Sequence, residues 1–450
     1  MKDLGRPGFW FPVALLVVTG LGSSALQSER CVHLSERDRT SYGTMPVWRA
    51  RFDALSATCG VGLLLYDLKV DYTPTGRWVL AGLGLVGALL YVAAARQAVG
   101  ALWSGAKPLP PVWVVLVAFL GWQILVVPLA WFLERTCGAG AALPTTTWNA
   151  IAAFASLGWL EPATSPRAAW IYALIAFLGA LGWGAWLLPV PATARRYVRL
   201  RSLLVLVVTW CAFLALSAAV ISWLEVPRGA ARGTGPDRRL AGAPADARYA
   251  RSLVQVTAAA GAGLPTEELK ERGVSEGTKL VLAGAVLVGG LGGAAGGGIR
   301  WPMLLALLSV AWPFGRATTE SQDDGTRRRV RAVVTCVITL VLLVLVVALG
   351  LLVIEAHTTT AFQTAPTLGD ALIDASSAVA GGNLSSGLTA TVTSANLSRG
   401  IHQSVDLYQY GLVWLLAAMF IGRTLPVLLL ARRAGAQGDV ATSRLPPTLI

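Results

Sequence analysis

Four short segments of the chain share a pattern that would let backbone carbonyl groups bind a cation. Each reads as a weakly apolar helix that runs into small or turn-forming residues, and aligning the four ends places Gly62, Gly158, Gly263 and Asn383 at one position. A loop with glycine can turn its carbonyls toward one point because no Cβ is in the way. Rings of carbonyls can replace the water shell of a cation. Four such loops predict a selectivity filter, whereas a single one would more simply allow close helix packing.

No other set of residues predicts a reaction. The three histidines, His33, His357 and His402, fall in predicted outer loops without a recognisable catalytic spacing. No two cysteines have C-x-x-C spacing, and the glycine-rich runs lack the Lys-Ser/Thr of a phosphate loop. We therefore expect neither an enzyme activity nor a covalently bound cofactor.

Two of the five cysteines, Cys31 and Cys137, fall in loops that we place on the outer side of a membrane. An oxidising compartment would allow a disulfide between them. Two unpaired thiols are the alternative.

The elements that must position the four loops are predicted to span a membrane. The chain has 450 residues, of which 55% are hydrophobic and 14% are charged. Eight apolar runs approach the ~20 residues that a helix needs to cross a bilayer: 9–26, 78–95, 111–133, 168–190, 202–223, 280–299, 332–354 and 407–431. No acidic residue falls inside these runs, so we place every acid in a loop. The first run could instead be a cleaved signal peptide, but the repeat described below needs it as an opening helix.

Arginines gather in the short connections 191–201 and 315–331 and in the tail that begins at Arg432. By the positive-inside rule these connections, and with them the N- and C-termini, lie in the cytoplasm. The net charge of +13 would suggest nucleic acid in a soluble protein, but here the basic residues lie in short connections between spans. The basic inner face by itself would suit anionic lipid as well as a protein partner. We expect the lipid bilayer as partner and no nucleic acid.

The runs and loops alternate as four units, each made of a spanning helix, a short pore helix, a small-residue loop and a second spanning helix. The units recur at intervals of roughly 100 residues. We expect an all-α integral membrane protein with about eight transmembrane helices, its four tandem repeats surrounding a pseudo-four-fold central pore. The repeats are 1–100, 101–195, 196–316 and 317–450, with pore loops near 52–63, 148–159, 252–264 and 370–389, and a cytoplasmic tail ends the last.

The ordered set of motifs resembles the superfamily of TrkH, KtrB and HKT potassium and sodium transporters. The resemblance in the filters is carried by Ser56-Ala57 with Gly62-Leu63, by Gly261-Ala262-Gly263-Leu264, and by Ser377-Ala378 with Leu384-Ser385. The stretch 289–300 is similar to a glycine-rich break in the sixth span, and 419–426 to the signature of the last span. The matches extend from about Phe9 to Arg433.

The resemblance implies that K+ binds at Gly62, Gly158, Gly263 and Asn383. It implies an intramembrane gate formed by Gly289, Gly290, Gly292, Gly293, Gly296, Gly297 and Gly298. Arg423 would lie below the filter and tune its occupancy or brace the pore. The alternative is an arginine near the inner interface that snorkels or satisfies backbone carbonyls. Arg300 is expected at the inner surface, where its long side chain reaches water.

The resemblance further implies a homodimer with a cytosolic nucleotide-binding regulatory ring docked on the basic inner face. The composition, rich in alanine, glycine and arginine and poor in lysine, suggests a bacterial plasma membrane.

Asn383 departs from the family, which usually has glycine there. Asparagine tolerates left-handed backbone angles, but its side chain would crowd the path or add an oxygen ligand. Another register would place Ser385 or Gly387 at this position. Sodium permeation, and a non-conducting relative that acts as a sensor or scaffold, are therefore kept as alternatives. A secondary transporter of broken helices is less favoured, since it would need an acid for coupling within a span.

Overall fold

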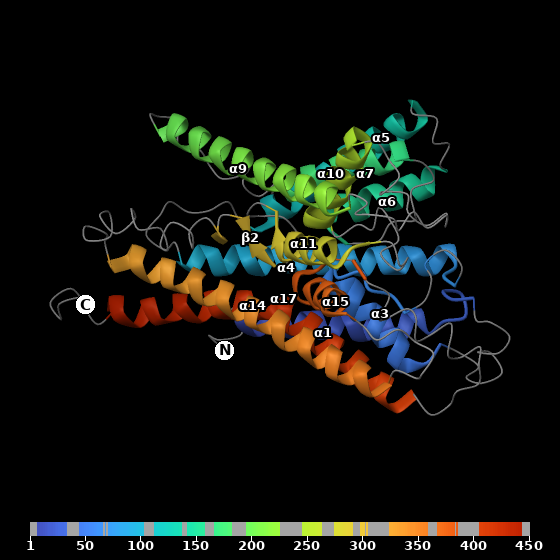
Figure 1. Cartoon of the computed structure of the whole chain (residues 1–450). Coiled ribbons are helices and arrows are strands. Elements are labelled where there is room, and N and C mark those ends of the chain that lie inside the picture. The colour runs from blue at the N-terminus through green and yellow to red at the C-terminus, as the bar shows by residue number, and fades with distance from the viewer. Residues whose placement is uncertain are drawn as a thin grey trace.

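The structure, a computed structural model, describes residues 7–33, 45–65, 68, 71–102, 112–136, 142–157, 166–181, 195–225, 245–262, 274–290, 298–301, 303–304, 324–358, 367–382, 384–385 and 405–442. Helices make up nearly all of this part of the chain, and a single pair of two-residue strands joins them (Figure 1). The all-α prediction is confirmed.

The helices recur as spanning helix, short helix and second spanning helix. The first two repeats contain α1 (Pro7–Leu26), α3 (Val47–Cys59), α4 (Pro74–Leu102), α5 (Val112–Thr136), α6 (Leu143–Ala155) and α7 (Pro166–Ala180). The last two contain α9 (Arg195–Leu224), α10 (Ala245–Ala262), α11 (Glu276–Leu287), α14 (Asp324–Thr358), α15 (Leu368–Ala380) and α17 (Val405–Thr442). Strands β1 (Val288–Gly289) and β2 (Ile299–Arg300) follow α11.

Six described helices are long and apolar enough to cross a membrane: Phe9–Leu26, Pro74–Ala98, Leu116–Thr136, Leu204–Leu224, Arg331–Ile354 and Gly411–Ala431. The other two of the eight predicted spans are represented by the apolar helix Ala169–Ala180 within α7 and by the 12-residue α11. The predicted runs 168–190 and 280–299 continue beyond both helices into residues that are not described.

Large apolar side chains point outward from the first helix of every repeat. They include Leu16 of α1, Ile124 of α5, Leu216 of α9 and Leu349 of α14, each more than half exposed. A water-soluble surface rarely carries such extended apolar faces. These helices therefore form the lipid-facing wall of the molecule.

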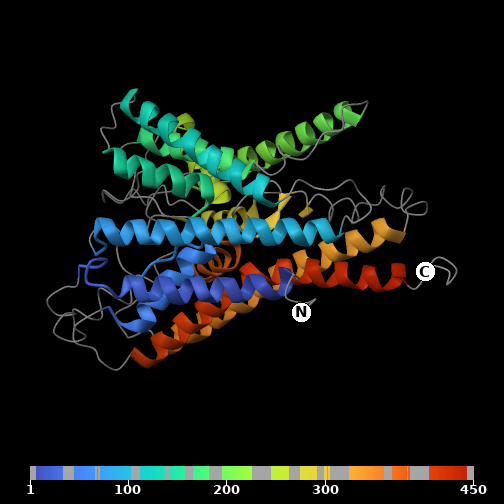
Figure 2. The same ribbon diagram turned by 180° about the vertical axis from the view of Figure 1, so that it is seen from behind.

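The second spanning helix of each repeat closes the repeats into a ring. Helix α4 packs against the short helices α3 and α6, α7 against α6 and α10, α11 against α10 and α15, and α17 against α15 and α3. Each thus contacts the short helix of its own repeat and that of the next, and α17 returns to the first. Views from both sides show α15 enclosed among longer helices (Figures 1 and 2).

The basic ends of the spanning helices lie at one end of the molecule. The C-terminal end of α4, the N-terminal ends of α9 and α14 and the C-terminal end of α17 all lie toward the left of Figure 1. Reversing the view places them together at the right (Figure 2). The described basic helix ends thus lie on one side of the bundle.

Three of the four short helices are too short to cross a bilayer and lie inside the protein. Helices α3, α6 and α15 have 13 residues each, which gives a length of about 20 Å against about 30 Å of hydrocarbon. Nearly every residue of α3 from Arg49 to Cys59 is buried. The start of α15 is fixed by a reciprocal capping box between Thr367 and Asp370, which satisfies amides that no helical carbonyl can reach.

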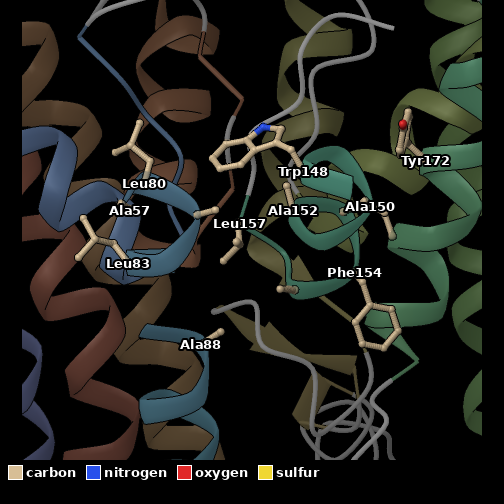
Figure 3. Close-up of a cluster of buried hydrophobic side chains, with 14 of the residues drawn as sticks. Ala57, Leu80, Leu83, Ala88, Trp148, Ala150, Ala152, Phe154, Leu157 and Tyr172 are labelled. Carbon is tan, nitrogen blue, oxygen red and sulfur yellow. The ribbon is translucent and has the colours of Figure 1, made fainter. Parts of the chain in front are cut away.

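Apolar packing joins the first two repeats around α6. Leu80 and Leu83 of α4 belong to the same buried cluster as Trp148 and Leu157 (Figure 3). Close-packed side chains of this kind hold the short helices at a fixed distance from one another.

The short helices also approach their spanning partners at glycines. A Cβ on Gly87 of α4 would overlap the carbonyl oxygen of Thr58, and one on Gly179 of α7 would overlap that of Phe154. A Cβ on Gly422 of α17 would likewise overlap the carbonyl oxygen of Val379. Thr58 and Phe154 are each the next-to-last residue of their short helix, as Val379 is in α15. The same contact in three repeats supports their equivalence.

We predict that Gly87→Ala lowers the free energy of unfolding by about 1–3 kcal/mol, because the methyl group must push α3 away from α4. Gly82→Ala on the same helix is the matched control, since a Cβ there meets no described atom within 4 Å. Thermal unfolding of the purified variants in detergent measures both. Equal midpoints for the two alanine variants would contradict the contact.

Candidate functional site

The short helices end in left-handed backbone conformations. The residues that follow α3, α6 and α15 are Gly60 with φ 65°, Ser156 with φ 55° and Gly381 with φ 73°. Each stands two residues before a predicted filter residue, namely Gly62, Gly158 and Asn383. In this conformation the chain turns sharply out of the helix.

The ends of three short helices meet. A Cβ on Gly60 would lie 3.4 Å from the carbonyl oxygen of Ser156. The hydroxyl of Ser156 donates a hydrogen bond to the carbonyl oxygen of Gly261 over 2.8 Å. Gly60, Ser156 and Gly261 occupy the same position in the aligned repeats, so the C-terminal ends of α3, α6 and α10 converge on one region.

The predicted first filter segment, residues 61–65, follows α3. It is neither helix nor β-strand, and most of it is buried. Gly62 has φ 78°, an angle that favours glycine. Val61 and Leu63 are each 1% exposed. The amide of Val61 donates to the carbonyl of Ser56 over 2.9 Å, which ties the start of this segment to the last turn of α3.

Of the other predicted filter residues, Gly158, Gly263 and Asn383 lie outside the described residues. The chain on either side of Asn383 is described. Ser377 accepts the amides of Gly381 and Gly382 through its backbone carbonyl, each over 3.0 Å, and its hydroxyl donates to the carbonyl of Leu384 over 2.6 Å. Ser377 in α15 and Ser56 in α3 both stand four residues before the left-handed residue, which aligns Asn383 with Gly62.

Arg423 of α17 is buried next to the end of α3. Its guanidinium lies 3.8 Å from the centre of the Tyr91 ring, and a Cβ on Gly60 would lie 3.7 Å from its Nη2. It is 3% exposed, and among the described residues its Nε and Nη1 have no hydrogen-bond partner. A snorkelling position is therefore excluded for this side chain. Cation–π contact with Tyr91 partly compensates the buried charge.

The expectation that Arg300 lies at the inner surface is wrong. Arg300 is 9% exposed, and its side chain hydrogen-bonds Tyr91 within electrostatic reach of Arg423. The parallel pairing of β2 with β1, which sets Ile299 opposite Val288 and Arg300 opposite Gly289, returns the chain to the interior. Two guanidinium groups thus share one buried tyrosine.

The predicted gate region is non-helical wherever it is described. Helix α11 ends at Leu287, Val288 and Gly289 form β1, and Gly298 has φ 77°. Trp301 donates its amide to the carbonyl of Gly290 over 3.3 Å. Gly292, Gly293, Gly296 and Gly297 lie outside the described residues.

Buried acids at the C-terminal ends of α5 and α9 are functional candidates that the sequence analysis missed. Glu134, placed in a loop, lies in the last turn of α5 and accepts hydrogen bonds from Thr146 and Tyr172. Glu225 accepts the Ser275 amide over 2.9 Å and the Thr278 hydroxyl over 2.6 Å. The placement of every acid in a loop was therefore wrong. Their position next to the ends of apolar runs was the available signal.

A third buried acid, Asp53, lies on α3 itself with its carboxylate fully enclosed. Asp374 occupies the equivalent position on α15 and is also 0% exposed. Both were read as loop residues because the short helices are polar compared with the spans.

Cys31 is a buried free thiol. Cys137 lies outside the described residues, so the bridge between them stays a prediction.

The geometry favours a cation where the short helices converge. The C-terminal end of a helix carries about half a negative charge from its unsatisfied carbonyls. Non-helical backbone at membrane depth is tolerated where protein encloses it or where it lines an aqueous cavity. The first filter segment meets this condition through its burial.

The comparisons with known proteins bear on the fold. No protein-family model matches the sequence, and no curated protein matches it. A solved structure that does match is the crystal structure of the potassium transporter TrkH from Vibrio parahaemolyticus, with a TM-score of 0.65 and 14% sequence identity. The match covers 98% of this chain and 85% of that one. The chain is therefore a multi-pass membrane protein with a TrkH-like fold, and the expected architecture of four helix–pore-helix–helix repeats is confirmed.

We predict that Ser156→Ala and Ser156→Gly differ in stability. Both lose the hydrogen bond to Gly261, which contributes about 1 kcal/mol. Only glycine also relieves the left-handed strain, which costs roughly 1–2 kcal/mol for other residues. Thermal unfolding should therefore rank native and glycine forms together and alanine lowest. An alanine variant as stable as the glycine variant would argue against the strained cap.

Proposed function

We propose that this protein moves monovalent cations across the plasma membrane through a pore formed within one chain. Potassium is the preferred ion and sodium the second candidate. No described span carries an acid midway along its length. A coupled carrier would need such an acid, so we propose passive or weakly coupled movement. We assign no catalytic step.

The observation that carries this proposal is the convergence of Gly60, Ser156 and Gly261 at the ends of α3, α6 and α10. The segments that follow these ends therefore start from one region. Their carbonyls would complete a ring around an ion, with Gly62, Gly158 and Gly263 supplying three of its sides. The structural neighbour is a potassium transporter, which points the same way.

The fourth side of the ring would be formed at Asn383. The alignment of Gly381 with Gly60 favours this register over one that uses Ser385 or Gly387. An asparagine there would present its backbone carbonyl and could add its side-chain oxygen as a further ligand. This position therefore governs the choice between potassium and sodium.

The arginines would set the exit from the filter. Arg423 lies beside Gly60 with Arg300 near it, so a cation leaving the filter on this side would meet two positive charges. Repulsion of this kind limits how tightly an ion is held. The glycine stretch 289–298 would form the gate, since extended backbone without side chains can move without repacking a core.

The chain would act as a homodimer with a cytosolic nucleotide-binding regulatory ring on its arginine-rich face. That face is formed by the helix ends at the left of Figure 1. Both termini would then be cytoplasmic, and the membrane would be a bacterial inner membrane.

Cation flux in liposomes tests the proposal directly. Native protein should carry K+ faster than Na+ and exclude a large organic cation. Asn383→Gly should conduct with a K+/Na+ ratio several-fold higher, because it restores an unobstructed ring. No flux in the native protein with flux in Asn383→Gly would identify a non-conducting relative. No flux in either would refute cation transport.

Replacement of Arg423 tests this repulsion. Arg423→Gln should lower the rate of K+ flux several-fold, since without the buried positive charge the filter holds the ion more tightly and releases it more slowly. Arg30→Gln is the control, because Arg30 is exposed on the outer loop. Equal flux in native protein and Arg423→Gln would remove this residue from the pathway.

A further inference from the structure

Asp53 joins the first filter segment to the outer scaffold of the protein. Its Oδ1 accepts the amide of Leu65 over 2.9 Å, and its Oδ2 accepts the hydroxyl of Tyr72 over 2.5 Å. The carboxylate is 0% exposed. We infer that Asp53 is the positioning residue that holds the segment 61–65 in its ion-binding geometry, an inference that rests on the proposed function.

The carboxylate acts at the far end of the filter segment. The near end is fixed by the hydrogen bond from Val61 to Ser56 in the last turn of α3. Leu65, 6% exposed, lies four residues further on. With both ends bonded to one helix, the carbonyls of the residues between them keep a fixed distance from α3.

Tyr72, which donates to Asp53, is itself held in place by the backbone around it. It pairs with Val32 in an isolated antiparallel bridge, and the next residue, Thr73, donates its amide to the carbonyl of Cys31 over 3.0 Å. The Thr73 hydroxyl donates to the carbonyl of Arg30 over 2.5 Å. The chain entering α4 is thus bonded to the chain leaving α1, and Asp53 connects this junction with the filter.

Other repeats use the same region of the short helix in related ways. Asn149, the residue equivalent to Asp53 on α6, is 4% exposed and hydrogen-bonds Tyr172 of α7. On α15 the hydroxyl of Ser377 holds the carbonyl of Leu384. A polar side chain on the short helix therefore reaches the following segment or spanning helix in each of these repeats. Asp53 accepts hydrogen bonds from both the following segment, through Leu65, and the residues that lead into α4, through Tyr72.

Three substitutions separate positioning from charge. Asp53→Ala removes both hydrogen bonds. Asp53→Asn keeps an oxygen for the Leu65 amide and turns an NH2 group toward Tyr72, whose hydroxyl oxygen can accept. Tyr72→Phe removes the hydrogen bond from Tyr72 to Asp53 and leaves the bond between Asp53 and Leu65. Thr58→Val is the matched control, because the buried Thr58 hydroxyl donates to the Ala54 carbonyl of its own helix, over 2.7 Å.

The experiment compares full-length variants in liposomes for K+ and Na+ flux, and in nanodiscs for amide hydrogen exchange of the peptide containing residues 61–65. Asp53→Ala should lower the K+/Na+ flux ratio about tenfold, as expected for losing a hydrogen bond to a charged group. The same variant should speed exchange of that peptide by a similar factor. Asp53→Asn and Thr58→Val should stay close to native in both measurements. Tyr72→Phe should give values between those of the native protein and those of Asp53→Ala.

An unchanged flux ratio in Asp53→Ala, or a lowered ratio without faster exchange, would overturn the inference. A loss of selectivity in Asp53→Asn equal to that in Asp53→Ala would also overturn it, because charge and not positioning would then matter. If Asp53→Ala fails to fold, the K+/Na+ flux ratio and the hydrogen exchange of residues 61–65 in Tyr72→Phe test the inference instead.

Failure of the proposed function gives a different result. A native protein without flux would refute cation transport and leave the exchange measurement to judge Asp53. Faster exchange of residues 61–65 in Asp53→Ala and Tyr72→Phe would then uphold its positioning role, and unchanged exchange would reject it.

Discussion

The backbone that follows α3, α6 and α15 leaves the helical conformation inside the helix bundle, and hydrocarbon would offer such backbone no hydrogen-bond partner. The remaining helices enclose this non-helical backbone in protein. Each second spanning helix packs on two short helices, so the four repeats close into a ring that shields the non-helical segments from lipid. The outer helices α1, α5, α9 and α14 then present apolar side chains outward. Inside, Ser56 and Ser377 hold the chain after α3 and α15 through their backbone carbonyls.

The ring depends on close backbone approach as well as on hydrogen bonds. Gly87, Gly179 and Gly422 face carbonyl oxygens in the last turns of α3, α6 and α15. Without side chains between them, the helix ends come close enough for Ser156 to reach the carbonyl of Gly261, 105 residues away in sequence. Small residues thus serve in packing here, as is common between membrane helices. The ends of α3, α6 and α10 meet as a result.

The sequence predicted what depends on local pattern: the spanning helices, the short helices and their four-fold repetition. It missed what depends on distant partners. Glu134 directly follows the run ending at Leu133, but α5 continues through it, and its partner Tyr172 lies 38 residues away. Arg300 follows a glycine run that ends a helix, and only the pairing of β2 with β1 shows that the chain turns inward. Gly62 was predicted from its neighbours, whereas Asp53, on the same short segment, was passed over as a loop acid.

Opposite electrostatic influences meet at the ends of the short helices. The helix C-termini, with their carbonyls, favour a cation, and Arg423 with Arg300 places positive charge directly beside Gly60. A site that only attracted cations would hold them and block further passage, since conduction needs binding that is favourable yet weak enough for release. Burying two guanidinium groups near each other is costly, and Tyr91, which contacts both, offsets only part of that cost. Such a pair beside Gly60 fits the proposed passage of cations, because it would limit how tightly an ion is held near the end of α3.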